Sequence, residues 1–162
     1  MNDSLGDRQK GYEKAFNYIL PRRMPVILRI DGVCFHSLTK GMERPFDSRL
    51  IDTMNYTALE LCRQIQGAKL AYIQSDEISI LIHNYTTLNS QPWFGNEIQK
   101  MVSVSAGIAS ASFNYARFKQ WFLDVREGKG GTFHLDSIPL ATFDSRVFIL
   151  PEADVTNYFL FR

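Results

Sequence analysis

Two acidic positions in this 162-residue sequence have the residue types that divalent-cation chemistry needs. Asp31 directly follows the apolar run Val26–Ile30, and Asp76 and Glu77 lie 45 positions further on, between two other apolar runs. Two Mg²⁺ ions held by shared carboxylates can activate an attacking oxygen and stabilise a leaving pyrophosphate. Taken singly, both segments are ordinary turn sequences. If folding brings them together, they predict phosphoryl or nucleotidyl transfer, with Asp31, Asp76 and Glu77 as catalytic residues.

The segment after Asp31 predicts a phosphate-binding backbone. Gly32 has no side chain, so backbone groups there can approach a metal ion or a triphosphate closely. Successive backbone N–H groups can bind phosphate oxygens as an amide nest. We therefore expect Gly32, Val33, Cys34 and Phe35 to contribute to nucleotide binding.

The apolar pattern predicts the order strand, helix, strand, strand, helix, strand. The expected elements are a strand at Val26–Ile30, a helix from Asp47 or Ser48 to about Gln66, strands at Leu70–Gln74 and Ile78–His83 joined by a turn at Ser75-Asp76-Glu77, a long helix from about Gly95 or Asn96 to Val125 with a bend or break near Gly107, a strand at Arg146–Leu150 and a final helix capped by Asp154. This order is the ferredoxin-like split βαββαβ pattern of a polymerase palm, an α+β fold with an antiparallel sheet and packed helices. In that topology the first strand lies beside the central hairpin, which brings the two acidic positions together.

Composition indicates one soluble domain over residues 1–162. The net charge is +1, and charged residues make up 22% of the chain, which is ordinary for a globular protein. Cys34 and Cys62 are the only cysteines, too few for a disulfide-dense secreted scaffold. No apolar stretch approaches the roughly 20 residues that a membrane span needs. We expect a cytoplasmic protein without a membrane partner.

Five segments of the sequence resemble the tRNA-histidine guanylyltransferase family in type, order and spacing. They are Arg29–Gly32 followed by Phe35 and His36, Glu43–Asp47, Gln74–Ser79, Phe143–Val147 and Asn157–Arg162. The resemblance covers nearly the whole chain from about Tyr12. It is closest to the bacterial and archaeal guanylyltransferase-like 3′-5′ polymerases, because Arg44 and Phe46 stand where eukaryotic members have Lys and Asn. Gly95-Asn96-Glu97 likewise replaces a basic run of those members.

The resemblance implies template-dependent 3′-to-5′ nucleotide addition to the 5′ end of tRNA, as tRNA repair or guanylylation of the histidine tRNA. It implies two Mg²⁺ ions, with GTP and ATP as substrates. By matching position, Asp31, Asp76 and the backbone of Gly32 would bind metal, and Glu77 would support that site. Further residues are placed at the bound nucleotides: His36, Arg44, Asp47, Ser75 and Lys100. The family also implies a homo-oligomer, a tetramer built as a dimer of dimers, and a C-terminal tRNA-handling segment that is missing after Arg162.

Two other functions remain open from the sequence. A nucleotide cyclase of the diguanylate type shares the palm topology and the paired carboxylates, and it would form a cyclic product without RNA. The full set of matching segments argues against it. A non-catalytic RNA-binding palm would bind tRNA without turnover, and the end of the chain at Arg162 favours this alternative.

Overall fold

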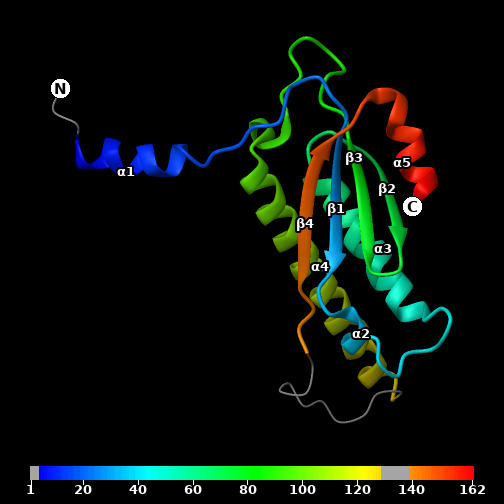
Figure 1. Cartoon of the computed structure of the whole chain (residues 1–162). Coiled ribbons are helices and arrows are strands. Elements are labelled where there is room, and N and C mark those ends of the chain that lie inside the picture. Colours follow the sequence, from blue (N-terminus) through cyan, green and yellow to red (C-terminus); the bar gives the residue numbers. More distant parts are fainter. Residues whose placement is uncertain (1–3, 129–138) are drawn as a thin grey trace.

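The computed structural model describes residues 4–128 and 139–162 of the chain. Its centre is a four-stranded sheet in the order β2-β3-β1-β4, in which every neighbouring pair is antiparallel. The strands are β1 (Val26–Gly32), β2 (Ala68–Gln74), β3 (Glu77–Ile82) and β4 (Phe143–Ile149), and the helices are α1 (Leu5–Lys14), α2 (Phe35–Leu38), α3 (Ser48–Gln64), α4 (Ile98–Arg126) and α5 (Val155–Phe161), with short 3₁₀ turns at Trp93–Asn96 and Glu152–Asp154 (Figure 1). The predicted α+β palm with split βαββαβ order is confirmed.

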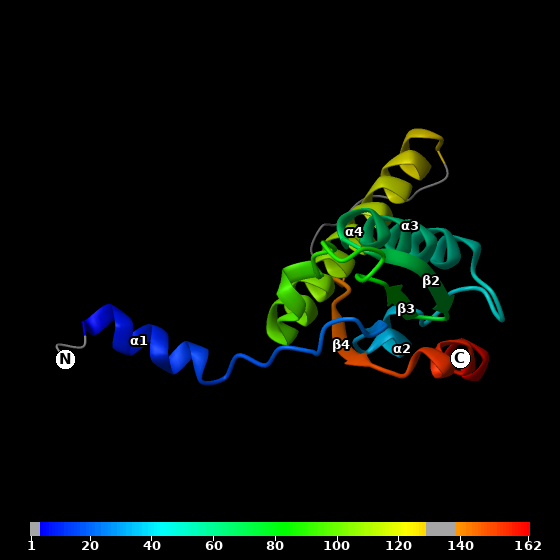
Figure 2. The same ribbon diagram turned by 90° about the horizontal axis from the view of Figure 1, so that it is seen from above.

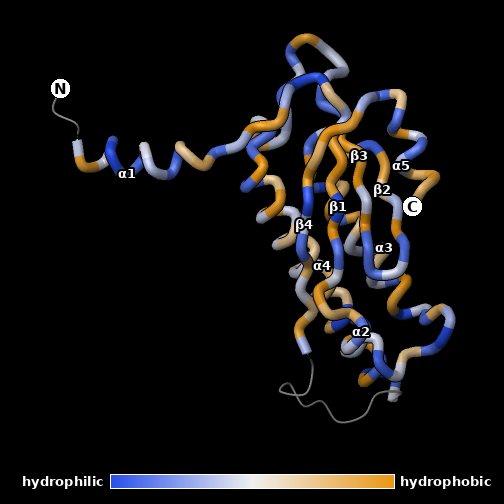
Figure 3. The backbone as a smooth tube through the Cα atoms, viewed as in Figure 1, coloured by the Kyte–Doolittle hydropathy of each residue, from blue (hydrophilic) through white to orange (hydrophobic). Residues whose placement is uncertain are grey.

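The two faces of the sheet have different coverings. Helices α3 and α4 pack on one face, and α5 lies on the other (Figure 2). Alternate residues of the two central strands are fully buried against α3 and α4, and Figure 3 shows the hydrophobic segments of the strands. These core residues are Val26, Leu28, Ile30, Ile78, Ile80 and Ile82. The intervening residues point to the side of α5, which we call the open face; they include Arg29, Asp31, Glu77, Ser79, Asp144 and Arg146.

Helix α3 forms as its sequence predicts. The Asp47 side chain caps it, because its Oδ1 accepts a hydrogen bond from the Leu50 N–H at 3.0 Å. The stripe of Met54, Ala58 and Leu61 is buried in the core. Helical spacing places these residues on one side of the helix, so burial of that stripe fixes how α3 lies on the sheet.

Helix α4 continues through Gly107 as one element, so of the predicted bend or break there the break is wrong. A glycine weakens a helix by only about 1 kcal/mol, and packing on both sides of this position outweighs that cost. The Ser105 hydroxyl donates to the Ser145 hydroxyl at 2.8 Å, and the Ser110 hydroxyl accepts from the Phe143 N–H at 3.0 Å. Small side chains therefore bring α4 close to β4.

Helix α1 was not predicted from the sequence. The Ser4 hydroxyl caps it by accepting from the Asp7 N–H at 3.1 Å, but none of its residues is buried. The helix projects away from the sheet (Figures 1 and 2). It lacks the apolar stripe on which a helix prediction depends, which explains the miss. No helix in the described ranges combines the length and apolar character needed to span a bilayer.

Candidate active site

The two predicted acidic positions meet at one end of the sheet. Asp31, near the end of β1, lies directly opposite Glu77 in the register of β1 and β3. The Gly32 N–H donates a hydrogen bond to the backbone carbonyl of Asp76 at 3.1 Å, which joins the end of β1 to the β2–β3 turn. Ser75 occupies the left-handed region in that turn, with φ 57°. The fold therefore places Asp31 beside Asp76 and Glu77, as the topology predicted.

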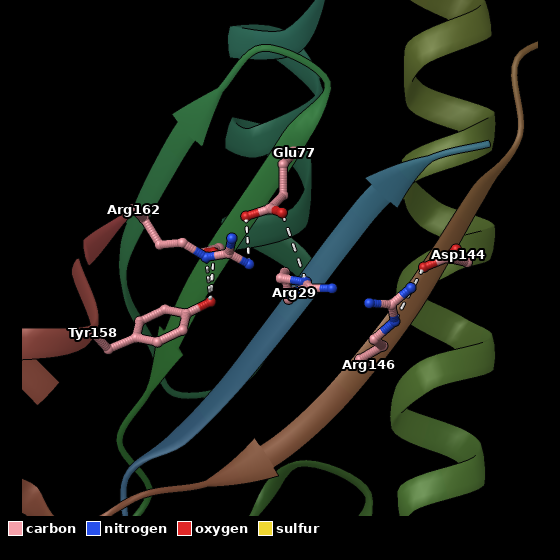
Figure 4. A network of polar contacts seen from close by, with 7 residues as sticks. Arg29, Glu77, Asp144, Arg146, Tyr158 and Arg162 are labelled. Carbon is pink, nitrogen blue, oxygen red and sulfur yellow. Dashed lines mark hydrogen bonds and ion pairs between the residues drawn. The ribbon is translucent and has the colours of Figure 1, made fainter. Parts of the chain in front are cut away.

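A third carboxylate adjoins Asp31 from the other side. Asp144 of β4 is its direct register partner, so Glu77, Asp31 and Asp144 form a row across three strands on the open face. Like charges directly opposite one another destabilise a sheet, and nearby cations offset this here. The next row carries Arg29 and Arg146, and Arg146 Nε lies 3.9 Å from Asp144 Oδ1 (Figure 4).

Two arginines at the site were missed by the sequence reasoning. Arg29 Nε lies 3.7 Å from one oxygen of Glu77, and Nη2 of Arg162, which directly follows α5, lies 3.0 Å from the other (Figure 4). Arg29 belongs to a segment that resembles the family, and alternation along β1 places it on the same face as Asp31, so two sequence signals could have identified it. The position of Arg162 depends on how α5 docks, which no local pattern shows.

The oxygen donors at this end of the sheet suit Mg²⁺. Among the described residues, no group of three or more His, Cys, Asp or Glu side chains is arranged to hold a metal ion. Mg²⁺ is commonly bound by only one or two carboxylates, with water and substrate phosphates completing its shell. Asp31, Asp76 and the backbone carbonyl of Gly32 are the groups at this end of the sheet that could supply such a donor set. Glu77 already contacts two guanidinium groups.

Backbone groups of the segment after Asp31 take part in hydrogen bonds and packing that the sequence does not predict. The Gly32 N–H donates to Asp76, and the Val33 N–H donates to the carbonyl of Thr142 at 2.9 Å, so neither amide is free for the predicted phosphate cradle. Gly32 is needed for packing, because a Cβ there would lie 2.3 Å from Cδ2 of Phe35. Cys34 is exposed, directly precedes α2, and has its backbone in the left-handed region.

The side chain of Phe35, as distinct from its backbone amide, is part of the hydrophobic core. Its side chain is 3% exposed, and its ring centroid lies 5.2 Å from that of Phe113 and 5.0 Å from that of Phe143. These distances are typical of favourable aromatic pairs. The side chain of Phe35 therefore belongs to the core beneath the site and does not face a nucleotide.

The predicted nucleotide-binding residues of the α2–α3 region lie near the same end of the sheet. His36, on α2, and Arg44, in the loop before α3, are both exposed. Figure 1 shows α2 beyond the end of β1. Asp47 follows in this loop, and its Oδ2 also accepts from the Glu43 N–H at 3.1 Å. Its carboxylate therefore orders the loop as well as capping α3.

The Asp47 carboxyl group has a shifted ionisation. The hydrogen bond from the Leu50 N–H lowers the pKa of this carboxyl group. Partial burial raises the pKa, and the hydrogen bond from the backbone N–H of Glu43 lowers it further. A depressed pKa means that the ionised form stabilises the fold above the ordinary aspartate pKa of about 4. This contribution is lost as the pH falls through the lowered pKa.

Lys100 is not brought to the carboxylates. It lies in the first turn of α4, which is joined to the chain before β1 by the Ile98 N–H donating to the Tyr18 carbonyl at 2.9 Å. This is the opposite end of the sheet from Asp31 (Figure 1). The Lys100 Nζ pairs with Glu97 at 3.1 Å. Within one chain, Lys100 and Asp31 therefore do not share a site.

A cavity of about 300 Å³ lies on the helical side of the sheet, between α3 and α4. Arg49 and Asp124 line it and form an ion pair at 3.0 Å. Its lining includes neither Asp31 nor Asp76. The cavity is thus separate from the carboxylate row.

Comparisons with known proteins agree with the fold and with the sequence segments. A family model described as tRNAHis guanylyltransferase (Thg1) matches residues 6–151. A bacterial tRNA(His) guanylyltransferase (Thg1)-like protein solved in complex with GTP is 47% identical, with a TM-score of 0.86, over 98% of this chain and 69% of that chain. The enzyme from Saccharomyces cerevisiae, at 23% identity and a TM-score of 0.67 over 93% of this chain and 62% of that one, shares the fold.

A sequence relative gives the same assignment. The tRNA(His) guanylyltransferase of Debaryomyces hansenii is 31% identical over 157 residues, which cover 93% of this chain and 54% of the relative. The chain thus spans about half the length of this curated relative. Because the family model covers most of the chain, and a solved bacterial relative matches in sequence and in structure, this chain belongs to the tRNA(His) guanylyltransferase (Thg1) family.

Proposed function

We propose that this chain is the catalytic palm of a nucleotidyltransferase that adds nucleotides in the 3′-to-5′ direction to the 5′ end of tRNA. The addition is template-dependent and serves tRNA 5′-end repair or guanylylation of the histidine tRNA. One observation carries the proposal: the Gly32–Asp76 hydrogen bond and the Asp31–Glu77 register set two separate acidic segments at one end of the sheet. Bacterial Thg1-like proteins solved with GTP and with ATP support nucleoside triphosphates as substrates.

The residues at this end of the sheet have complementary tasks in the proposal. Asp31, Asp76 and the Gly32 carbonyl hold two Mg²⁺ ions. When bound, these ions make the attacking hydroxyl more acidic and stabilise the charge that develops on the leaving pyrophosphate. Arg29 and Arg146 offset the repulsion within the carboxylate row. Glu77 supports the metal site by its ion pairs with the neighbouring arginines.

The bound nucleotides are assigned to the region beside α2. Exposed Arg44 contacts triphosphate oxygens, and Ser75 borders the site next to Asp76. His36 and Asp47 lie near the base, with Asp47 also fixing the loop that carries Arg44. Because Lys100 lies at the other end of the sheet, its role requires a second copy of the chain. This agrees with the proposed homo-oligomer, a dimer of dimers in the cytoplasm.

The test is extension of a tRNA that lacks its first 5′ nucleotide. The protein is incubated with Mg²⁺, GTP and ATP, and the products are resolved by length. We expect addition of the nucleotide that the opposite strand of the acceptor stem specifies, and none when Mg²⁺ is chelated. A cyclic product from GTP without RNA would instead indicate the cyclase. Binding of tRNA with no extension would indicate a non-catalytic palm.

A further inference from the structure

The carboxylate of Glu77 is divided between two cations. Its Oε1 forms the shorter ion pair, at 3.0 Å to Arg162 Nη2, while Oε2 lies 3.7 Å from Arg29 Nε. The side chains of Glu77, Arg162 and Arg29 are only 18%, 17% and 23% exposed, so water screens these contacts less than surface ion pairs. Both oxygens of Glu77 therefore point toward guanidinium groups.

Arg162 is itself fixed by a chain of contacts that returns to β3. Its Nε donates to the Tyr158 hydroxyl at 3.5 Å, and that hydroxyl lies 2.9 Å from the Ser79 hydroxyl. Ser79 is buried two residues after Glu77 on the same strand. The Tyr158 ring also packs edge-on against Phe148, with centroids 5.7 Å apart. The docking of α5 thus determines where the Arg162 guanidinium lies (Figure 4).

The charge of Arg162 acts on more than Glu77. The hydrogen bond with Tyr158 raises the pKa of Arg162, and the negative charges of Glu77 and Asp31 act in the same direction. Arg162 therefore stays protonated beside the carboxylate row. Without it, Glu77 would have only the long contact to Arg29, whose buried Nε has no hydrogen-bond partner among the described residues.

We propose that Arg162 is a positioning residue that keeps Glu77 out of the cation site formed by Asp31 and Asp76. This inference rests on the proposed metal-dependent function. It adds that the docking of α5 determines which carboxylates can bind the metal ion. With Glu77 engaged, a divalent cation meets two carboxylates and remains open to water and to substrate phosphates, as Mg²⁺ prefers. Released from Arg162, Glu77 becomes available as a third carboxylate ligand.

The test measures Mn²⁺ affinity in the absence of nucleotide and RNA, by electron paramagnetic resonance of the free ion. Arg162→Gln removes the cation and keeps a polar side chain of similar reach. We expect it to tighten Mn²⁺ binding roughly tenfold, the scale on which groups next to metal ligands alter affinity. A residue with a merely structural role would weaken binding or leave it unchanged when replaced.

Two matched variants separate positioning from simple charge removal. In the double variant Arg162→Gln/Glu77→Gln the gain should disappear, because the freed carboxylate is its source. Arg146→Gln removes a cation from the same face without affecting the contacts of Glu77, since Arg146 lies beside Asp144. On a logarithmic scale of Mn²⁺ affinity, it should give less than half of the gain that Arg162→Gln gives.

A further variant tests the inference if Arg162→Gln fails to fold. Tyr158→Phe keeps the ring packed on Phe148 and removes only the hydroxyl. It should then tighten Mn²⁺ binding by about threefold, which corresponds to the loss of one modest hydrogen bond.

The outcomes distinguish this inference from the function beneath it. Wild-type binding that is unchanged or weakened by Arg162→Gln would overturn the inference alone. A gain that persists in the double variant, or that Arg146→Gln reproduces in full, would do the same, because it would arise from net charge. A wild-type protein that does not bind Mn²⁺ would overturn both the inference and the proposed metal site.

Discussion

Asp76→Asn should lower the rate of nucleotide addition by about 10³-fold, because it removes a charge that holds the catalytic cations. The fold should survive. Asparagine is favoured in turns, and the contact that Asp76 makes with the Gly32 N–H uses its backbone carbonyl. The measurement is single-turnover extension of a 5′-truncated tRNA at saturating GTP, with circular dichroism to confirm folding.

Asp144→Asn is the matched control for Asp76→Asn. It makes the same chemical change in the carboxylate row, beside Asp31, at a residue outside the proposed metal pair. We expect it to slow addition by less than about tenfold, the size of an indirect electrostatic effect. Equal losses in the two variants would mean that Asp144 contributes as much to nucleotide addition as Asp76 does. In that case the pairing of Asp31 with Asp76 would be wrong.

Phe35→Ala should destabilise the protein by about 3–5 kcal/mol, the usual cost of truncating a buried phenylalanine. The side chain is 3% exposed and is packed between Phe113 and Phe143, directly beneath the end of β1. Urea denaturation followed by circular dichroism measures the change in the free energy of unfolding. Such a loss is a large share of the stability of a domain of this size.

Phe46→Ala is the control for the phenylalanine prediction. Phe46 is 76% exposed in the loop before α3, so its truncation should change the free energy of unfolding by less than about 0.5 kcal/mol. If Phe35→Ala left stability unchanged and raised the KM for GTP, the side chain would contact nucleotide. Its placement in the core would then be incorrect.

The sheet and its two packed helices could be predicted because their signals are local. Alternation in β3, the stripe of α3 and the cap at Asp47 each depend on residues close in sequence. The βαββαβ order then leaves few topologies, and the one that forms places Asp31 beside Asp76. The proximity of Asp31 and Asp76 follows from the sequence because it is set by where the strands end and not by the packing of individual side chains.

The parts that could not be predicted depend on tertiary docking. Asp144 joins the carboxylate row only because β4 pairs with the outer side of β1, and Arg162 reaches Glu77 only because α5 packs on the open face. The sequence gives no sign that the Val33 amide is unavailable for phosphate, because its acceptor, the carbonyl of Thr142, is distant in sequence. Lys100 is a different case: β3 runs away from the Asp76 turn, so the predicted order already implies that the helix after β3 begins at the far end of the sheet.

The proposed nucleotide addition depends on divalent cations held by Asp31 and Asp76. Anomalous diffraction from crystals grown with Mn²⁺ and GTP can locate these cations. We expect Mn²⁺ peaks within about 2.5 Å of carboxylate oxygens of both residues, next to the triphosphate. A well-ordered triphosphate with its Mn²⁺ bound elsewhere, or with neither aspartate among the ligands, would show that these residues do not form the metal site.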